Sequence, residues 1–263
     1  MHAIAVNGVT LNYRLEGSEG APVLVFSNSL GTDYRIWHRL IPHLPPGLRI
    51  LRYDKRGHGL SDYPPQPWGM ADHVADLAGL MDALELRDAV VCGLSVGGII
   101  AQGLAAERPD LAAAIILCDT AAKIGTPDMW DERIAAVRQG GIAALADAIL
   151  ERWLTAEFRT RAPDFPLWRN MLLRSPAEGY IGTCAAIRDT DLVESTSRLR
   201  LPCLAVAGSE DGSTPPDLVR ETASLIPGSR FEVIRGAGHI PGVERAETLG
   251  RLITGFLQDN GYV

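Results

Sequence analysis

The sequence predicts an α/β fold, in which a mostly parallel β-sheet is covered by helices on both faces. Short apolar or alternating runs are separated by turns and by stretches with helical spacing, and this order recurs along the chain. The order is interrupted once, between residues 123 and 198, where helical spacing continues without a clear strand. With 263 residues, 46% of them hydrophobic, the chain is long enough to bury a core without disulfide bonds.

Five strands are predicted in the first half of the chain. Residues 23–26 form a continuous apolar run, as in a strand that is covered on both faces. The five predicted strands cover residues 11–15, 23–26, 49–53, 89–92 and 114–118. Apolar residues at three- and four-residue spacing predict two helices, over 70–84 and 98–107.

The second half begins with the interruption and then returns to the alternating order. Three of the five tryptophans lie in the interruption, at Trp130, Trp153 and Trp168. Beyond it we expect two strands and two helices, at 203–207 and 231–234, and at 217–225 and 244–258. We therefore predict a core of residues 1–122 and 199–263 with a helical cap of residues 123–198. Such an insertion commonly covers the ligand crevice, the alternative being a side-lobe without ligand contact.

Composition excludes several classes of function. Twenty-five basic against 32 acidic residues give a net charge of −7, which argues against nucleic acid as a partner. Apolar runs fall short of a membrane span, and the first residues lack the pattern of a signal peptide, so we expect a cytoplasmic protein. No metal-binding spacing is present, so no metal is expected. We expect reduced, buried thiols at all four cysteines, Cys92, Cys118, Cys184 and Cys203.

The strongest local signal is a serine between two glycines where a predicted strand meets a predicted helix. Gly93, Ser95 and Gly97 form the pattern Gly-x-Ser-x-Gly directly after the strand at 89–92. A strand that turns sharply into a helix projects its corner hydroxyl at the carboxyl edge of the sheet, and small neighbours let the backbones pass closely. We therefore expect Ser95 to be a nucleophile. The alternative is a glycine-rich turn without chemistry.

A serine hydroxyl needs a base to remove its proton. His239 follows the predicted strand at 231–234 in a glycine-flanked segment, which brings it to the same edge of the sheet as Ser95. An isolated loop histidine is usually only solvated, and the shared edge is what favours a role here. The other five histidines lie at the terminus, in a turn or in predicted helical stretches, at His2, His38, His43, His58 and His73.

The base needs an acid that orients its ring and stabilises its charged form. Asp211 follows the predicted strand at 203–207 and is favoured. Asp119 follows the strand at 114–118 and is the rival, since either strand end could reach the histidine. Glu210 is a weaker rival. The resulting chain order is Ser95, Asp211, His239.

These features and two further segments resemble the α/β-hydrolases over nearly the whole chain. Asp54-Lys55-Arg56-Gly57-His58-Gly59-Leu60-Ser61 matches the family's Asp-x-Arg-Gly-x-Gly-x-Ser turn, and Gly238-His239 with Glu244 matches its final segment. The family also has the chain order nucleophile, acid, base. The resemblance implies an eight-stranded sheet, a helical cap and Ser-His-Asp catalysis that requires no cofactor and no metal.

The resemblance also implies an oxyanion hole made of backbone N–H groups. Where most relatives have His-Gly after the third strand, this chain has Asn28-Ser29, and that alignment places Leu30 at the oxyanion position with Val96 as its partner. Because backbone groups donate, Asn28 need not harm catalysis. It does put any role of the usual histidine in doubt.

Four segments are similar to a smaller group within this family, the 3-oxoadipate enol-lactonases. They are residues 26–32, 53–61, 119–125 and 184–189. Those enzymes open an enol-lactone to 3-oxoadipate during bacterial breakdown of aromatic acids. This substrate is an anion, so a cation is expected in the pocket. The candidates are cap residues, with Arg133 first, then Arg188 and Lys123, and with Trp130 and Trp153 as apolar walls. Cap arginines are more often solvated, and tryptophans at helical spacing are more often core.

Other functions remain open on the same fold. A general carboxylesterase, a cofactor-free perhydrolase or a carbon–carbon bond hydrolase would use the same three residues. A ligand receptor with an idle triad is an alternative of another class. Enzymes with an aspartate nucleophile are disfavoured, because the corner residue is Ser95. Oligomeric state cannot be predicted from the sequence.

Overall fold

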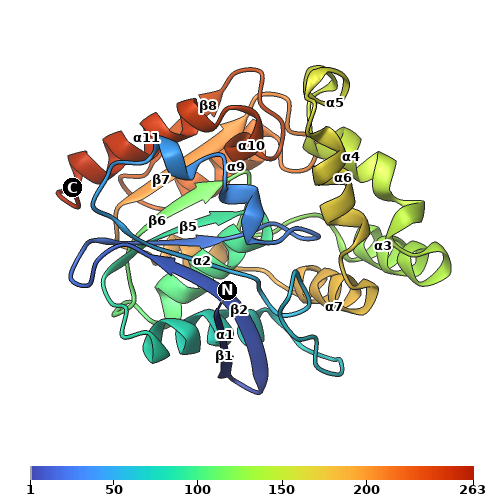
Figure 1. Cartoon of the computed structure of the whole chain (residues 1–263), viewed down its shortest axis with the longest axis horizontal. Helices are drawn as coiled ribbons and strands as arrows, with labels where there is room; N and C mark the ends of the chain where they lie inside the picture. The colour runs from blue at the N-terminus through green and yellow to red at the C-terminus, as the bar shows by residue number, and fades with distance from the viewer. Residues whose placement is uncertain (1) are drawn as a thin grey trace.

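The computed structural model describes residues 2–263, and its strands form a single sheet (Figure 1). Eight strands are present in this part of the chain, in the order β1-β2-β4-β3-β5-β6-β7-β8. Their bounds are β1 His2–Val6, β2 Val9–Glu16, β3 Val23–Ser27, β4 Arg49–Tyr53, β5 Ala89–Leu94, β6 Ala112–Cys118, β7 Cys203–Gly208 and β8 Arg230–Ile234. β1 and β2 pair antiparallel, as do β2 and β4, and the remaining pairs are parallel. The predicted mostly parallel sheet is confirmed.

Only β1 lies outside the predicted strands. It is an edge strand with largely exposed side chains, so it lacks the apolar run that marks the inner strands. Asn7 and Gly8 join it to β2, and both have positive φ, 48° and 76°. This is the two-residue turn that Asn-Gly favours in hairpins.

Outside the stretch between β6 and β7, four α-helices and a short turn of helix carry the chain between the strands and to its end. They are α1 Met70–Ala83, α2 Val96–Glu107, α9 Pro216–Ser224, α10 Pro241–Glu244 and α11 Ala246–Asp259. Short 3-10 turns, η1 Tyr34–Trp37 and η2 Ile41–His43, follow β3. α1 packs on α2, which packs on β5 and β6, whereas α11 contacts η2 and lies on another side of the sheet (Figure 1). The helix predicted at about 244–258 is confirmed as α11, which begins two residues later because the backbone breaks at Arg245, whose φ and ψ are −137° and 47°.

The stretch between β6 and β7 is helical throughout the described residues. It contains α3 Pro127–Gly140, η3 Ile142–Ala144, α4 Ala146–Trp153, α5 Ala156–Arg161, α6 Phe165–Leu173, α7 Ala177–Arg188 and α8 Val193–Ser197. We call residues 123–198 the cap. Figure 1 shows α3, α4 and α6 beyond the end of the sheet toward which β5 and β6 point. The division of the chain at residues 122 and 198 stays a prediction.

Two smaller expectations concern the described residues 2–263 as a whole. All four cysteines are buried and free of disulfide bonds, as predicted. No helix in this range combines the length and apolar character needed to cross a bilayer.

Candidate active site

Ser95 sits at the sharp turn between β5 and α2 in a strained backbone conformation. Its φ is 57° and its ψ is −121°, a region that residues with a side chain rarely adopt. A Cβ on Gly93 would lie 2.1 Å from the carbonyl oxygen of Gly97, and a Cβ on Gly97 would lie 2.1 Å from that of Ser27. Both glycines are therefore required by close backbone contacts. The result is a partly exposed serine hydroxyl at the carboxyl edge of the sheet.

His239 and Asp211 are joined by a buried hydrogen bond. Nδ1 of His239 lies 2.8 Å from Oδ2 of Asp211, and the two residues are 1% and 5% exposed. Asp211 also accepts from the Thr214 hydroxyl at 2.7 Å and from the Ser213 N–H at 2.7 Å. Burial alone would raise the pKa of Asp211, but the facing His239 and these donors hold it below its usual value. Because Nδ1 is engaged by the acid, Nε2 is the ring nitrogen left for the pocket.

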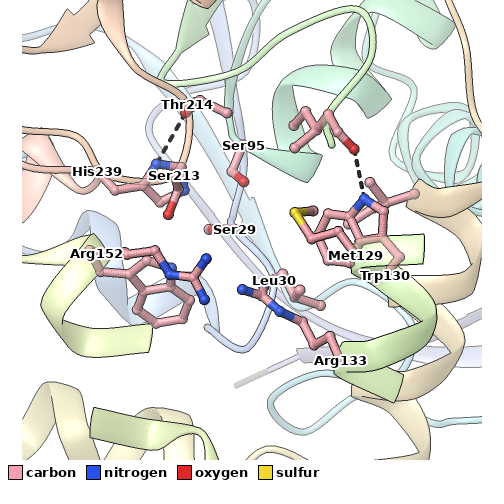
Figure 2. Close-up of a pocket in the computed structure, with 13 residues that line it drawn as sticks. Ser29, Leu30, Ser95, Met129, Trp130, Arg133, Arg152, Ser213, Thr214 and His239 are labelled. Atoms are coloured by element: carbon pink, nitrogen blue, oxygen red, sulfur yellow. Dashed lines mark hydrogen bonds between the residues drawn. The ribbon is translucent and has the colours of Figure 1, made fainter. Parts of the chain in front are cut away.

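Ser95 and His239 line the same pocket, although they are 144 positions apart in numbering (239 − 95 = 144). Figure 2 shows both side chains at one end of that pocket, with Thr214 and Ser213 beside the histidine. The structure therefore brings together the three side chains that the sequence suggested for nucleophile, base and acid. Glu210, the weaker rival for the acid, is exposed.

The two residues predicted for the oxyanion hole, Leu30 and Val96, both lie near Ser95. Leu30 lines the pocket and is buried, and Val96 is the first residue of α2, directly after Ser95. Neither backbone N–H donates a hydrogen bond to another group within residues 2–263. The first N–H groups of a helix have no partner inside the helix and point toward its N-terminal end. Two backbone donors are thus free beside Ser95.

The loop that carries Leu30 is braced from the turn at residues 54–61. Lys55 Nζ donates to the Ser29 carbonyl oxygen at 2.6 Å, and the Gly31 N–H donates to Nε2 of His58 at 2.9 Å. Lys55 and His58 are buried, and burial lowers the pKa of each, to about 7 for the lysine. The neutral histidine acts here as a hydrogen-bond acceptor, so its position is structural.

The cap forms the other wall of the pocket. Trp130 and Arg133 come from α3, and Arg152 and Trp153 come from α4. Met129, Ile124 and Ile187 complete this wall. Figure 2 shows the side chains of Arg133 and Arg152 extending toward one another into the space below Ser95.

The two pocket arginines differ from most charged residues of this molecule because they lack an acidic partner. Within residues 2–263 neither Arg133 nor Arg152 forms a salt bridge, and Arg133 stacks its guanidinium over Trp130 at 5.1 Å. Partial burial, and then the like charge of Arg133, lower the pKa of Arg152. Uncompensated positive charge therefore collects at the pocket.

The structure places two of the predicted cations elsewhere. Arg188 does not line the pocket. Its guanidinium is paired with Asp131 at 2.6 Å and with Asp189 at 2.7 Å. Lys123 is exposed and paired with Asp191 at 2.9 Å. A cation that is already paired with carboxylates binds an anionic ligand only weakly. Arg152 was not among the predicted residues, since the cap carries many arginines and no motif marks this one.

A short cap segment, residues 152–155, is hydrogen-bonded to the loops that carry the acid and the base. We call it the strap. The His239 N–H donates to the Trp153 carbonyl oxygen at 2.8 Å, and the Gly212 N–H donates to that of Arg152 at 3.2 Å. The Trp153 ring also stacks on the His239 ring, with centroids 6.4 Å apart.

Glu244 ties the strap to the histidine loop from behind. One carboxylate oxygen accepts from the Thr155 hydroxyl at 2.6 Å and from its N–H at 2.9 Å, and the other accepts from the Gly238 N–H at 2.7 Å. The residue is buried and every one of these donors is on the strap or the loop before His239. Glu244 therefore adds a further connection between the cap and the loop of His239.

Comparison with known proteins identifies the class of this site. A family model described as the alpha/beta hydrolase fold matches residues 22–246. The chain belongs to the α/β-hydrolase family and is a hydrolase.

Within that family the chain is similar to enol-lactonases over nearly its full length. The chain is 32% identical to 3-oxoadipate enol-lactonase 2 of Acinetobacter baylyi over 256 residues, which covers 97% of this chain and 96% of the relative. The crystal structure of the enol-lactonase from Burkholderia xenovorans LB400 is 39% identical, with a TM-score of 0.94, and the match covers 98% of this chain and 100% of that one. A thermophilic esterase from Thermogutta terrifontis, with malate bound, is 29% identical with a TM-score of 0.91, over 98% and 99% of the two chains.

Proposed function

We propose that this protein is a serine hydrolase that opens 3-oxoadipate enol-lactone to 3-oxoadipate in the cytoplasmic breakdown of aromatic acids. The observation that carries the substrate class is the pair of arginines, Arg133 and Arg152, without acidic partners in the described residues and in the same pocket as Ser95. A carboxylate on the substrate supplies the missing partner. The likeness to enol-lactonases supports the particular lactone.

The proposed reaction begins with attack of Ser95 Oγ on the lactone carbonyl carbon while His239 takes the hydroxyl proton. Asp211 stabilises the charged imidazole through the bond to Nδ1. The N–H groups of Leu30 and Val96 hold the tetrahedral oxyanion. A donor of this kind lowers the barrier by about 3 kcal/mol.

Collapse of the tetrahedral intermediate breaks the bond to the ring oxygen. His239 returns its proton to the leaving enol oxygen, which stays attached to the acyl chain, and the enol becomes a ketone as a proton moves from this oxygen to the enol carbon. His239 then activates a water molecule, which releases the acyl chain from Ser95 as a second carboxylate. Trp130 and Trp153 provide the apolar walls for the lactone ring.

Entry of the lactone requires a change in the pocket wall. The cavity measures about 50 Å³, which holds a few water molecules and is too small for the lactone. Because Arg133 and Arg152 extend toward one another across it, their side chains are the groups that must part. Both are long and flexible, so the movement needs no unfolding of the cap.

The test is ring opening of the enol-lactone by the purified protein, measured beside hydrolysis of neutral p-nitrophenyl esters. We expect kcat/KM for the lactone to exceed that for the neutral esters by about 100-fold or more. Equal or faster turnover of the neutral esters would instead favour a general carboxylesterase, which the likeness to the Thermogutta esterase makes the second candidate. Labelling of Ser95 by a fluorophosphonate separates both from a receptor with an idle triad.

A further inference from the structure

A second carboxyl group lies beside the proposed triad and takes no part in the mechanism above. Asp119 follows β6, is 0% exposed, and offers a carboxylate oxygen that lies with atoms of Asp211 and His239 within a mutual distance of 4.8 Å. Two carboxylates so close in a buried place cannot both be charged without strong repulsion. One of them must hold a proton.

The hydrogen bonds show which carboxyl group is the charged one. Asp211 faces three donors, from His239, Thr214 and the Ser213 N–H. Asp119 faces one, the Gly208 N–H, which donates to its Oδ1 at 2.7 Å. No lysine or arginine forms a salt bridge with Asp119 anywhere in residues 2–263. The negative charge is therefore stabilised on Asp211.

The second oxygen of Asp119, Oδ2, has no hydrogen-bond partner if the carboxyl group is ionised and can only accept. Oδ2 is buried and has no hydrogen-bond partner among the described residues. A buried polar atom without a hydrogen-bond partner destabilises the fold. A proton on Oδ2 removes this penalty, because the atom then becomes a donor, and the Asp211 carboxylate is an acceptor in the same cluster.

We propose that Asp119 is a positioning residue of the triad, in which a neutral carboxyl group accepts the Gly208 N–H through Oδ1 and donates a hydrogen bond from Oδ2 to the Asp211 carboxylate. It fixes the acid without adding a second negative charge. The titratable groups that face it are Asp211, His239 and the buried thiol of Cys118. Burial, and then the charge of Asp211, raise the pKa of Asp119 well above its ordinary value, which agrees with this assignment.

The backbone makes asparagine the matched substitution. Asp119 has a φ of 45°, in the left-handed region that aspartate and asparagine tolerate better than other residues with a side chain. In Asp119→Asn the amide oxygen can accept from Gly208 and the amide N–H can donate to Asp211. The variant therefore reproduces the proposed neutral form and only removes the ability to ionise.

The first test is thermal and does not depend on any substrate. A carboxyl group that keeps its proton in the fold and loses it on unfolding makes the protein less stable as pH rises above about 4. The Tm of Asp119→Asn minus that of the wild type is therefore expected to grow steadily between pH 5 and pH 8. Asp217→Asn, at an exposed aspartate, is the control whose difference stays constant. A constant difference for Asp119→Asn as well would overturn the proposal.

The second test is kinetic and rests on the proposed serine chemistry. If the protein does not hydrolyse the ester at all, the proposed function fails, while the thermal test of Asp119 still stands. With p-nitrophenyl hexanoate, Asp119→Asn is expected to retain kcat within about threefold, with an unmoved acid limb of the rate–pH profile. Asp119→Ala lacks the donor, so Asp211 holds the charged imidazole more tightly and the acid limb moves to higher pH. A merely structural residue would lower the rate without moving the limb. Loss of more than tenfold in Asp119→Asn would show that its charge is needed and would refute the assignment.

Discussion

The two walls of the pocket are built on different principles. On the core wall the histidine and the loop of Leu30 are held in place by hydrogen bonds within the fold, as in the Asp211–His239 bond and the Lys55 bond to the Ser29 carbonyl oxygen. On the cap wall Arg133 and Arg152 have no acidic partner within residues 2–263. A wall whose side chains are held in place suits chemistry, whereas a wall of positive charges without acidic partners suits the binding of an anionic ligand. Reaction type and substrate charge are therefore assigned to separate walls.

Substitution on the core wall is expected to have the largest effect. Ser95→Ala removes the proposed nucleophile, so kcat should fall by about 10⁴-fold or more for every substrate, charged or neutral. Fluorophosphonate labelling should disappear while Tm stays close to that of the wild type. Ser213→Ala, a serine in the same pocket, is the control that keeps the label. Turnover by Ser95→Ala at the wild-type rate would end the serine mechanism.

Substitution on the cap wall is expected to act on charged substrates alone. Arg133→Ala and Arg152→Ala each remove one charge-assisted contact, so kcat/KM should fall by about 10- to 100-fold for p-nitrophenyl hydrogen adipate. The rate with p-nitrophenyl hexanoate, which lacks the terminal carboxylate, should change by less than about threefold. Arg188→Ala is the matched control, because that arginine is already paired with acids outside the pocket. An equal loss on both esters would mean that these arginines support the fold and not the substrate.

The strap is where the two walls are joined, and its disruption should affect both. Thr155→Val removes the hydroxyl that bonds Glu244 and receives the N–H of Phe158, at a cost of about 1–2 kcal/mol in the free energy of unfolding. We expect a lower Tm and a three- to tenfold loss of kcat/KM with charged and neutral esters alike. Thr160→Val on the same helix, at an exposed threonine, is the control. A loss confined to the charged ester would separate the strap from the histidine loop.

The hydrogen bond from Lys55 to the Ser29 carbonyl oxygen on the core wall is expected to act on stability alone, through a dependence on pH. Burial lowers the pKa of Lys55 from 10.5 to about 7, so between these values the unfolded chain binds a proton that the folded chain does not. Stability that depends on this lysine therefore rises with pH from about 7 to about 10.5 and is level below 7. The Tm of the wild type minus that of Lys55→Met should increase over this range. A flat difference would show that Lys55 stays charged in the fold.

The residues of the core wall could be predicted from the sequence because close backbone contacts and the order of the strands determine where they lie. Ser95 stands between two glycines that close backbone contacts require, and His239 and Asp211 follow parallel strands that end at one edge. Between Asp211 and Asp119 the sequence favoured Asp211, and in the structure Asp211 is the one hydrogen-bonded to His239. The unpredicted β1 shows the same limit, because a mostly exposed edge strand has no apolar run.

The residues of the cap wall could be predicted only in part. Arg133 was a candidate because it lies near Trp130, but nothing local distinguishes Arg152 from Arg188, since both occur in helices of the cap. The packing of α4 against the histidine loop turns one into the pocket, and Asp131 and Asp189 neutralise the other. Long-range packing decides which charge remains available.

One ratio tests most directly whether the core wall carries out the reaction while the cap wall selects substrates by their charge. The ratio is kcat/KM for 3-oxoadipate enol-lactone divided by kcat/KM for p-nitrophenyl hexanoate, measured in the wild type and in the double variant Arg133→Ala, Arg152→Ala. We predict that the ratio falls by about 100-fold or more in the double variant, almost entirely through the lactone. An unchanged ratio, with the lactone still preferred, would contradict the assignment of substrate charge to the cap.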